Sequence, residues 1–330
     1  MKSNLTLIST KGMSREGWLA ERRKAIGGSD AAAIVGLNDY ATPYTVWADK
    51  TGRLPEKEDS EAMRQGRDLE QYVADRFTEK SGKKTRKVNA IIRNPAYPFA
   101  SANIDRDIVG EDSGLECKTT SVLNLRKFKD GDFPANYYVQ AVHYLAITEY
   151  SRWYVGVLIL NQGFFIYQLT RFENDTCPEW CESSVYVSGA EIAALMGAEA
   201  DFWNLVENGT PPDVNGSKAD SQALAAIYGE SVNNTEPVWL AGHETTVHRY
   251  LALKDQIGSL EDELEQLKQA LQLELKENER GQIDDFVITW KKQSSSTFDV
   301  KAFAADNPDI DLSGYYKKTT FRKFDLKQIS

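Results

Sequence analysis

The spacing of apolar positions is most clearly helical in residues 60–82. Leu69, Val73 and Phe77 recur near one face of a helix, charged residues separate them, and Gly82 supplies a stop signal. This segment therefore predicts one long amphipathic helix.

Shorter apolar patterns predict further elements in the first 210 residues. A helix capped by Ser14 ends before the Gly27-Gly28 pair, and a second helix, capped by Ser29 or Asp30, follows through Val35. More helices are expected at residues 136–148 and 190–207.

Strand patterns lie between these helices, at residues 87–93, 100–109 and 114–119. Residues 153–169 predict a β-hairpin that turns at Asn161-Gln162-Gly163. Together these elements predict an α/β fold, with a mixed central β-sheet flanked by helices.

The last third of the chain has a different pattern. Residues 208–220 are typical of a loop, so we expect a core at 1–210, a linker region at 211–245 and an extension at 246–330. In the extension, apolar residues alternate at three- and four-residue steps, the pattern of a coiled coil or helical hairpin: Tyr250, Leu253, Ile257, Leu260, Leu264, Leu267 and Leu271.

This apolar stripe has two interpretations, packing against the protein's own core or oligomerisation. Strands of a small β extension are expected after it, at residues 286–292 and 319–326.

Composition places the chain among ordinary globular proteins. Its three cysteines form no disulfide framework, and the polar start lacks the apolar run of a signal peptide, so we expect a cytoplasmic protein. The most apolar run, 153–169, is interrupted by its turn, which argues against a membrane span.

Charge is segregated along the chain. Residues 1–100 hold 18 Lys and Arg against 13 Asp and Glu, whereas residues 151–300 hold 10 against 24. A basic groove in an otherwise acidic protein would follow nucleic-acid phosphates without indiscriminate binding, although solvated helix faces explain the same pattern.

Candidate chemistry centres on Glu116 and Lys118. Residues two apart on a strand share a face, so these two side chains point together while Cys117 turns to the buried side. An acid two residues before a lysine occurs three more times in the chain, at Glu274/Lys276, Asp299/Lys301 and Asp325/Lys327. The pair therefore needs support from its surroundings.

Asp105 supplies that support. If residues 100–109 form a strand, 110–114 a turn and Leu115 begins the next strand, Asp105 lies beside Glu116. Two carboxylates and a lysine are what Mg²⁺-dependent hydrolysis requires, and burying them without a function is costly. A cross-strand salt bridge is the structural alternative.

Five ordered segments resemble one known family. They are IGGSD at 26–30, GRDLE at 66–70, NIDR at 103–106, LECKTTS at 115–121 and YYVQAVHYLAIT at 137–148. They look like the YqaJ-type phage recombination exonucleases, relatives of lambda exonuclease in the PD-(D/E)XK nuclease superfamily. The resemblance covers residues 18–153, and the C-terminal segments resemble the extension of longer members.

The resemblance implies a restriction-endonuclease-like core and cleavage that depends on Mg²⁺, or on Mn²⁺ in its place. Asp105, Glu116 and the Cys117 carbonyl would hold the principal metal, and Glu70 would help hold a second one. Lys118 would position the attacking water.

The family motifs also imply two supporting sets of residues. Gln140 would support the catalytic lysine or its water. Ser29 and Arg22 would grip a 5′-phosphate, with Arg23 as the alternative to Arg22. The usual proline before the first acid is replaced by Ile104, which leaves the ligands unaffected. Three cysteines do not suffice for the four-cysteine iron–sulfur cluster of some relatives, so none is expected.

The family also implies digestion of double-stranded DNA from 5′ ends and a single-strand annealing protein as partner. It further implies a homo-oligomer, by resemblance a ring of three subunits, encoded by a phage or prophage and acting in a bacterial cell. An endonuclease of the same fold and a non-catalytic DNA- or partner-binding scaffold are the alternatives.

Overall fold

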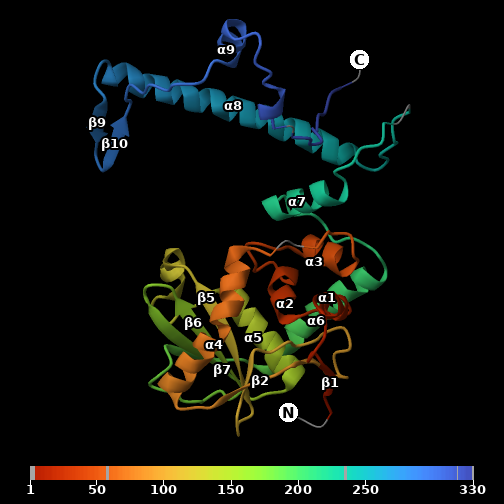
Figure 1. Cartoon of the computed structure of the whole chain (residues 1–330). Coiled ribbons are helices and arrows are strands. Elements are labelled where there is room, and N and C mark those ends of the chain that lie inside the picture. The colour runs from red at the N-terminus through yellow and green to blue at the C-terminus, as the bar shows by residue number, and fades with distance from the viewer. Residues whose placement is uncertain (1–3, 57–58, 234–235, 318, 329–330) are drawn as a thin grey trace. The chain divides into compact units, whose positions relative to one another are not determined.

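The computed structural model describes residues 4–56, 59–233, 236–317 and 319–328. The chain divides into two compact units, a larger one of residues 1–230 with 322–330 and a smaller one of residues 231–321. Figure 1 shows the elements of both units.

A mixed sheet forms the centre of the larger unit. Within the described residues it has six strands in the order β2-β4-β5-β6-β7-β8. β5 runs parallel to β6, β7 parallel to β8, and the other pairs are antiparallel. The strands are β2 (Thr85–Lys87), β4 (Arg106–Ile108), β5 (Ser113–Thr120), β6 (Arg152–Ile159), β7 (Gly163–Thr170) and β8 (Ser183–Tyr186).

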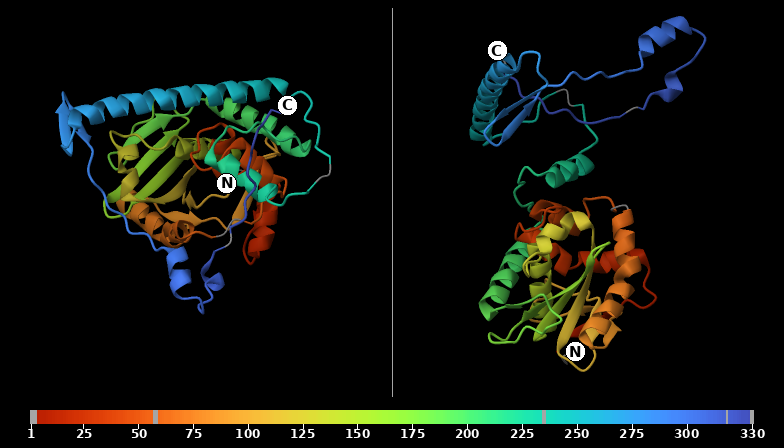
Figure 2. Two further views of the ribbon diagram at one scale, coloured as in Figure 1. Left: turned by 90° about the horizontal axis from the view of Figure 1, so that it is seen from above. Right: turned by 90° about the vertical axis from the view of Figure 1, so that its left-hand side faces the viewer.

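Helices cover both faces of this sheet, which confirms the predicted α/β class. Side chains alternate along a strand, so Trp153 and Val155 of β6 pack with α5 (Ala135–Thr148), whereas Tyr154 packs with α4 (Glu61–Ser81). Helix α6 (Gly189–Glu207) packs on α5. The right-hand view of Figure 2 shows α4, in orange, on one side of the sheet and α6, in green, on the other.

The predicted long helices and the hairpin are confirmed. Ser60 caps α4 and Gly82 ends it with a left-handed φ of 72°. Antiparallel β6 and β7 turn at Asn161, whose φ is 62°.

Helices near the N-terminus differ in detail from the prediction. Helix α1 (Arg15–Arg23) is capped by Ser14, as predicted. Helix α2 (Gly28–Ile34) is capped by Gly27, whose N–H donates to the Asp30 carboxylate, so the predicted cap at Ser29 or Asp30 is wrong. Both residues already lie in the first turn of α2.

Two predicted strands are shorter than the sequence suggested. Residues 87–93 contain the end of β2 and a separate strand, β3 (Ala90–Arg93), which pairs with β1 (Thr6–Ser9). In 100–109 a regular strand is confined to β4, because Ala100 and Ala102 form isolated bridges to Ile26 and Ile92 instead.

Several described elements were not predicted. Thr42 caps α3 (Pro43–Lys50), and α7 (Lys218–Ile227) lies inside the 211–245 segment that we expected as a linker. A short 3₁₀ helix, η1 (Val122–Phe128), joins β5 to the loop before α5. None of the described helices is long and apolar enough to cross a membrane.

The smaller unit is built on α8 (Glu244–Leu275), the predicted long helix, whose apolar stripe is exposed within that unit. A hairpin of β9 (Arg280–Ile283) and β10 (Phe286–Thr289) follows, then α9 (Val300–Asp306) and η2 (Ser313–Tyr315). The predicted strand at 319–326 is wrong, since these described residues are irregular and pair with no described strand.

Candidate active site

Strand β5 carries the acid and lysine of the candidate site. Glu116 and Lys118 face α5, and their Oε1 and Nζ atoms are 2.8 Å apart. Cys117 points to the opposite face, where it packs with the apolar side chains between α4 and the sheet. The predicted division of faces along this strand is confirmed.

Asp105 lies beside Glu116, as the predicted register requires. β4 and β5 pair Arg106 with Leu115, so the next position of the register sets Asp105 opposite Glu116. The Cys117 N–H donates to Oδ2 of Asp105 over 2.8 Å. Backbone N–H and C=O groups of one strand residue face the same side, so the Cys117 carbonyl faces the edge occupied by Asp105.

The two carboxylates are close together; Glu116 is buried and Asp105 is half-buried. Burial, and then the negative charge of Glu116, raises the pKa of Asp105 well above its usual value. Oε2 of Glu116 is buried without a hydrogen-bond partner among the described residues. Oε1 of Glu116 is paired with Lys118 and Gln140, and Oδ2 of Asp105 accepts from the Cys117 N–H, so Oε2 of Glu116 is the carboxylate oxygen that a further positive group would satisfy.

Lys118 remains a charged donor in this setting. Burial alone lowers its pKa, but the Glu116 carboxylate outweighs that effect, so the pKa of Lys118 is raised above its usual value. The Lys118 ammonium also lies 5.1 Å from the ring centroid of Tyr137.

Gln140 of α5 links the acid, the lysine and the segment before β4. Its Oε1 accepts from Lys118 Nζ over 2.8 Å, and its Nε2 donates to Glu116 Oε1 over 2.7 Å. The same Nε2 lies 2.9 Å from the Tyr144 hydroxyl, which donates to the Asn103 carbonyl over 3.1 Å. Tyr144 and Asn103 are thus positioning residues that our sequence analysis did not assign.

Arg22 and Ser29 meet on the other side of Gln140. Arg22 Nη2 donates to Ser29 Oγ over 2.6 Å, and the guanidinium lies over the Trp18 ring. Asp30 holds this pair in place through Arg22 and through the buried Lys50, whose Nζ is 2.6 Å from Asp30 Oδ2. Burial raises the pKa of Asp30, but these two cations outweigh it and lower the pKa to about 2.

Arg23 points elsewhere. Its Nε lies 3.6 Å from Asp49 Oδ1. Adjacent residues of a helix project about 100° apart, so one of the two arginines faces Ser29 while the other turns towards α3.

One cavity of about 170 Å³ joins these parts, and it is called here the end cavity. The predicted site residues Arg22, Ser29, Asp105, Glu116 and Gln140 all line it, together with Trp18, Gly27, Gly28, Ile91, Ser101, Asn103 and Tyr144. A cationic fork and two acids thus open on the same small space.

Glu70 is engaged by cations. Its carboxylate accepts from the buried Arg106 guanidinium, and Lys87 Nζ lies 3.6 Å from Oε1. In the part of the chain that the structure describes, no three His, Cys, Asp or Glu side chains gather in a group that could hold a metal ion.

The remaining donor set fits a hard divalent cation. Asp105, Glu116 and the Cys117 carbonyl offer oxygen ligands only, the kind that Mg²⁺ prefers. A cation there would satisfy the orphaned Oε2 of Glu116 and remove the repulsion that raises the pKa of Asp105.

Comparison with known proteins gives the chain a family. A model of the YqaJ-like viral recombinase domain matches residues 17–151. The uncharacterized protein YqaJ of Bacillus subtilis is 38% identical over 328 residues, 98% of each chain. The protein belongs to the YqaJ-like viral recombinase family. The family model spans every residue of the end cavity.

Solved structures similar to this family member include two exonucleases. An alkaline exonuclease from Laribacter hongkongensis is 18% identical, with a TM-score of 0.47, covering 59% of this chain and 94% of that one. A phage-related exonuclease from Haemophilus somnus is 11% identical, with a TM-score of 0.38, covering 58% and 99%.

Proposed function

We propose that this protein is a metal-dependent exonuclease that digests linear double-stranded DNA in the 5′-to-3′ direction. The product is a 3′ single-stranded overhang, used in recombination by strand annealing. One observation carries the proposal: Arg22 and Ser29 share the end cavity with Asp105, Glu116 and Gln140. A terminal phosphate bound by Arg22 and Ser29 would place the next phosphate of the strand, the scissile one, next to Asp105 and Glu116.

Binding of the terminal phosphate falls to Arg22 and Ser29. The planar guanidinium offers two parallel N–H donors to phosphate oxygens, and the hydroxyl offers another. The Trp18 ring stacks against the guanidinium, and Asp30, which also pairs with Lys50, orients it through an ion pair. The site is small, which favours the end of a strand over a continuous one.

Asp105, Glu116 and the Cys117 carbonyl would hold Mg²⁺, or Mn²⁺ in its place, and Glu70 would help hold a second ion directly or through water. The bound metal would polarise the scissile phosphate and lower the pKa of a water molecule. An iron–sulfur cluster is no part of this proposal.

Lys118 and Gln140 act on the water and on phosphate charge. The raised pKa of Lys118 keeps its ammonium protonated at neutral pH, so it donates hydrogen bonds and orients the water instead of removing its proton. Gln140 holds the ammonium and the Glu116 carboxylate at fixed positions through its two amide atoms.

The viral recombinase family supports a wider setting for this activity. The partners would be DNA ends, a single-strand annealing protein and further copies of the chain, assembled by family resemblance as a ring of three subunits. Its place would be the cytoplasm of a bacterial cell.

Digestion of linear duplex DNA with and without 5′-phosphates, compared with closed circular DNA, tests the proposal. We expect Mg²⁺-dependent loss of the 5′-phosphorylated linear DNA, abolished in Lys118→Ala, with circular DNA intact. Circular dichroism of the variant checks that it folds. Cleavage of circular DNA would favour an endonuclease, and absence of cleavage with any divalent metal would favour a binding scaffold.

A further inference from the structure

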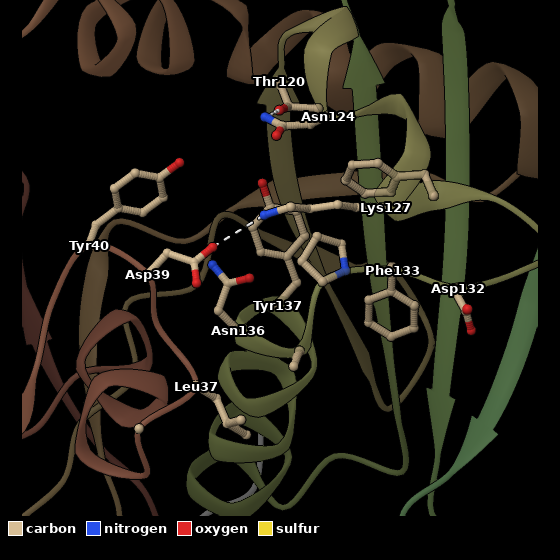
Figure 3. Close-up of a pocket in the computed structure, with 14 residues that line it drawn as sticks. Leu37, Asp39, Tyr40, Thr120, Asn124, Lys127, Asp132, Phe133, Asn136 and Tyr137 are labelled. Carbon is tan, nitrogen blue, oxygen red and sulfur yellow. Dashed lines mark hydrogen bonds and ion pairs between the residues drawn. The ribbon is translucent and has the colours of Figure 1, made fainter. Parts of the chain in front are cut away.

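A second, larger cavity of about 490 Å³ lies at the end of β5. It is called here the track cavity. The loop after α2 with Asp39, the 3₁₀ helix η1 with Asn124 and Lys127, and the first residues of α5, Asn136 and Tyr137, form its walls. Figure 3 shows Asp39 and Tyr40 on one side of this space and Asp132 on the opposite side.

Strand β5 connects the two cavities. Glu116 lines the end cavity, Thr120 lines the track cavity, and Lys118 lies between them on the same face of the strand. The ring of Tyr137, in the wall of the track cavity, lies 5.1 Å from Lys118 Nζ. A strand whose 5′ end occupied the end cavity and whose scissile phosphate met Lys118 would continue into the track cavity.

The groups in the track cavity suit a nucleic-acid backbone. Lys127 is the cation among the lining residues, beside the carboxylates of Asp39 and Asp132, and Asn124 Nδ2 donates to Thr120 Oγ1 over 2.9 Å. The N-terminal end of α5 also opens into it, and no side chain within the described residues caps that helix. Its volume is that of a cavity for a small ligand such as one nucleotide.

Lys127 forms an exposed ion pair with Asp39, which a phosphate can replace. The dashed line in Figure 3 joins its Nζ to Asp39 Oδ2, 3.2 Å apart. Half of the Lys127 side chain and 74% of the Asp39 side chain are exposed. An ion pair so exposed contributes little to stability, so a phosphate can replace the carboxylate.

We propose that the track cavity is a subsite for the DNA strand on the 3′ side of the scissile bond. When a DNA strand enters, Lys127 releases Asp39 and binds a backbone phosphate. When no strand is present, the Asp39 carboxylate occupies the Lys127 ammonium and competes with other anions for it. This inference rests on the proposed function. It adds a binding subsite for the DNA strand and an ion pair, Lys127–Asp39, that a polyanion displaces.

Charge-matched variants test the subsite. Lys127→Ala removes the proposed contact, and Lys129→Ala removes an equal charge from an exposed position directly after η1 that is outside the lining. Asp39→Asn frees Lys127. Its control, Asp130→Asn, changes a carboxylate outside the lining, where the φ of 56° suits asparagine.

The Kd for 5′-phosphorylated duplex DNA is measured in EDTA, which prevents cleavage, over a series of salt concentrations. For Lys127→Ala we expect a rise of five- to tenfold and a salt slope smaller by about one, as for the loss of one phosphate contact. For Asp39→Asn we expect tighter binding by about two- to threefold. Both control variants keep the wild-type Kd within about twofold.

The outcomes separate this inference from the proposed function. Equal effects of Lys127→Ala and Lys129→Ala, or unchanged binding in Asp39→Asn, would overturn the subsite even if the protein digests DNA. If the wild type binds DNA with the expected pattern of variants but never cleaves it, Lys127 stands as a DNA contact, whereas the exonuclease proposal and the position of the subsite relative to a scissile bond both fall. If the wild type does not bind DNA, both fall.

Discussion

Gly28 lies directly against the ring of Tyr144. A Cβ at residue 28 would lie 2.6 Å from Cε1 of that ring, closer than two such atoms can approach. Helix α2 carries Ser29 and helix α5 carries Gln140, so this contact sets the distance between the Ser29 side and the acid side of the end cavity. The second glycine of the IGGSD segment is therefore a packing requirement.

Gly28→Ala is expected to push α2 and α5 apart. Overpacking of this kind costs about 1–3 kcal/mol of unfolding free energy. Urea denaturation measures that loss, and we expect a lower kcat/KM for DNA digestion with it. Gly27→Ala is the control, because a Cβ there meets Asp30 Oδ2 at 3.5 Å and its φ of −101° suits any residue. Equal stability of the two variants would contradict the packing argument.

Variants of Arg22 and Arg23 distinguish recognition of the 5′-phosphate from a general effect of positive charge on DNA binding. Arg22→Lys keeps the charge but loses the planar fork that we propose binds the terminal phosphate, so we expect the preference for 5′-phosphorylated over 5′-hydroxyl ends to fall about tenfold. Arg23→Lys, directed at Asp49, should keep that preference. Competition between the two kinds of end in one digestion measures it. A loss of preference in Arg23→Lys with Arg22→Lys unchanged would reverse the assignment.

Sequence patterns predicted the part of the site that depends on strand periodicity. The short connection at residues 109–112 sets the register of β4 and β5, and that register brings Asp105 to Glu116 even though β4 is shorter than predicted and β5 begins at Ser113. Alternation of side chains then directs Glu116 and Lys118 away from Cys117. These relations follow from local geometry, so they are visible without a structure.

Relations between distant segments were not visible in this way. Whether Arg22 or Arg23 faces Ser29 depends on the rotation of α1 against α2, and no periodicity fixes that rotation in a helix of nine residues. The walls of the track cavity are irregular segments without a repeat. Helix α3 does have a start signal in the sequence, since Thr42 caps it and Pro43 is its first residue.

A buried pair, His143 of α5 and Glu199 of α6, lies behind the end cavity. Nδ1 of His143 is 2.8 Å from Glu199 Oε1, and Nε2 is 2.9 Å from the carbonyl of Ser101, which lines that cavity. Both ring nitrogens thus face oxygen atoms, and the charged imidazolium can donate to each. Asp30 of α2 adds a further negative charge in the vicinity.

This pair makes stability depend on pH. Burial lowers the pKa of His143, but the charge and hydrogen bond of Glu199 outweigh it, so the pKa is raised above its usual value of about 6.5. A histidine whose pKa is higher in the folded than in the unfolded protein contributes its full stabilisation at pH values below the unfolded-state pKa. That stabilisation is lost as the pH rises through the folded-state pKa. We therefore expect the unfolding free energy contributed by this pair to fall above about pH 6.5.

Urea denaturation of the wild type and of Glu199→Gln between pH 5.5 and 9 measures this contribution. In the variant the imidazolium loses its counter-charge. The unfolding free energy of the wild type should therefore exceed that of the variant most at low pH, and this difference in free energy should narrow as the pH rises. His248→Gln, at an exposed position of α8, is the control for loss of a histidine outside this pair. A difference between the wild type and Glu199→Gln that is constant across this range would mean that His143 does not change its charge there. The pair would then hold Ser101 in place through hydrogen bonds alone.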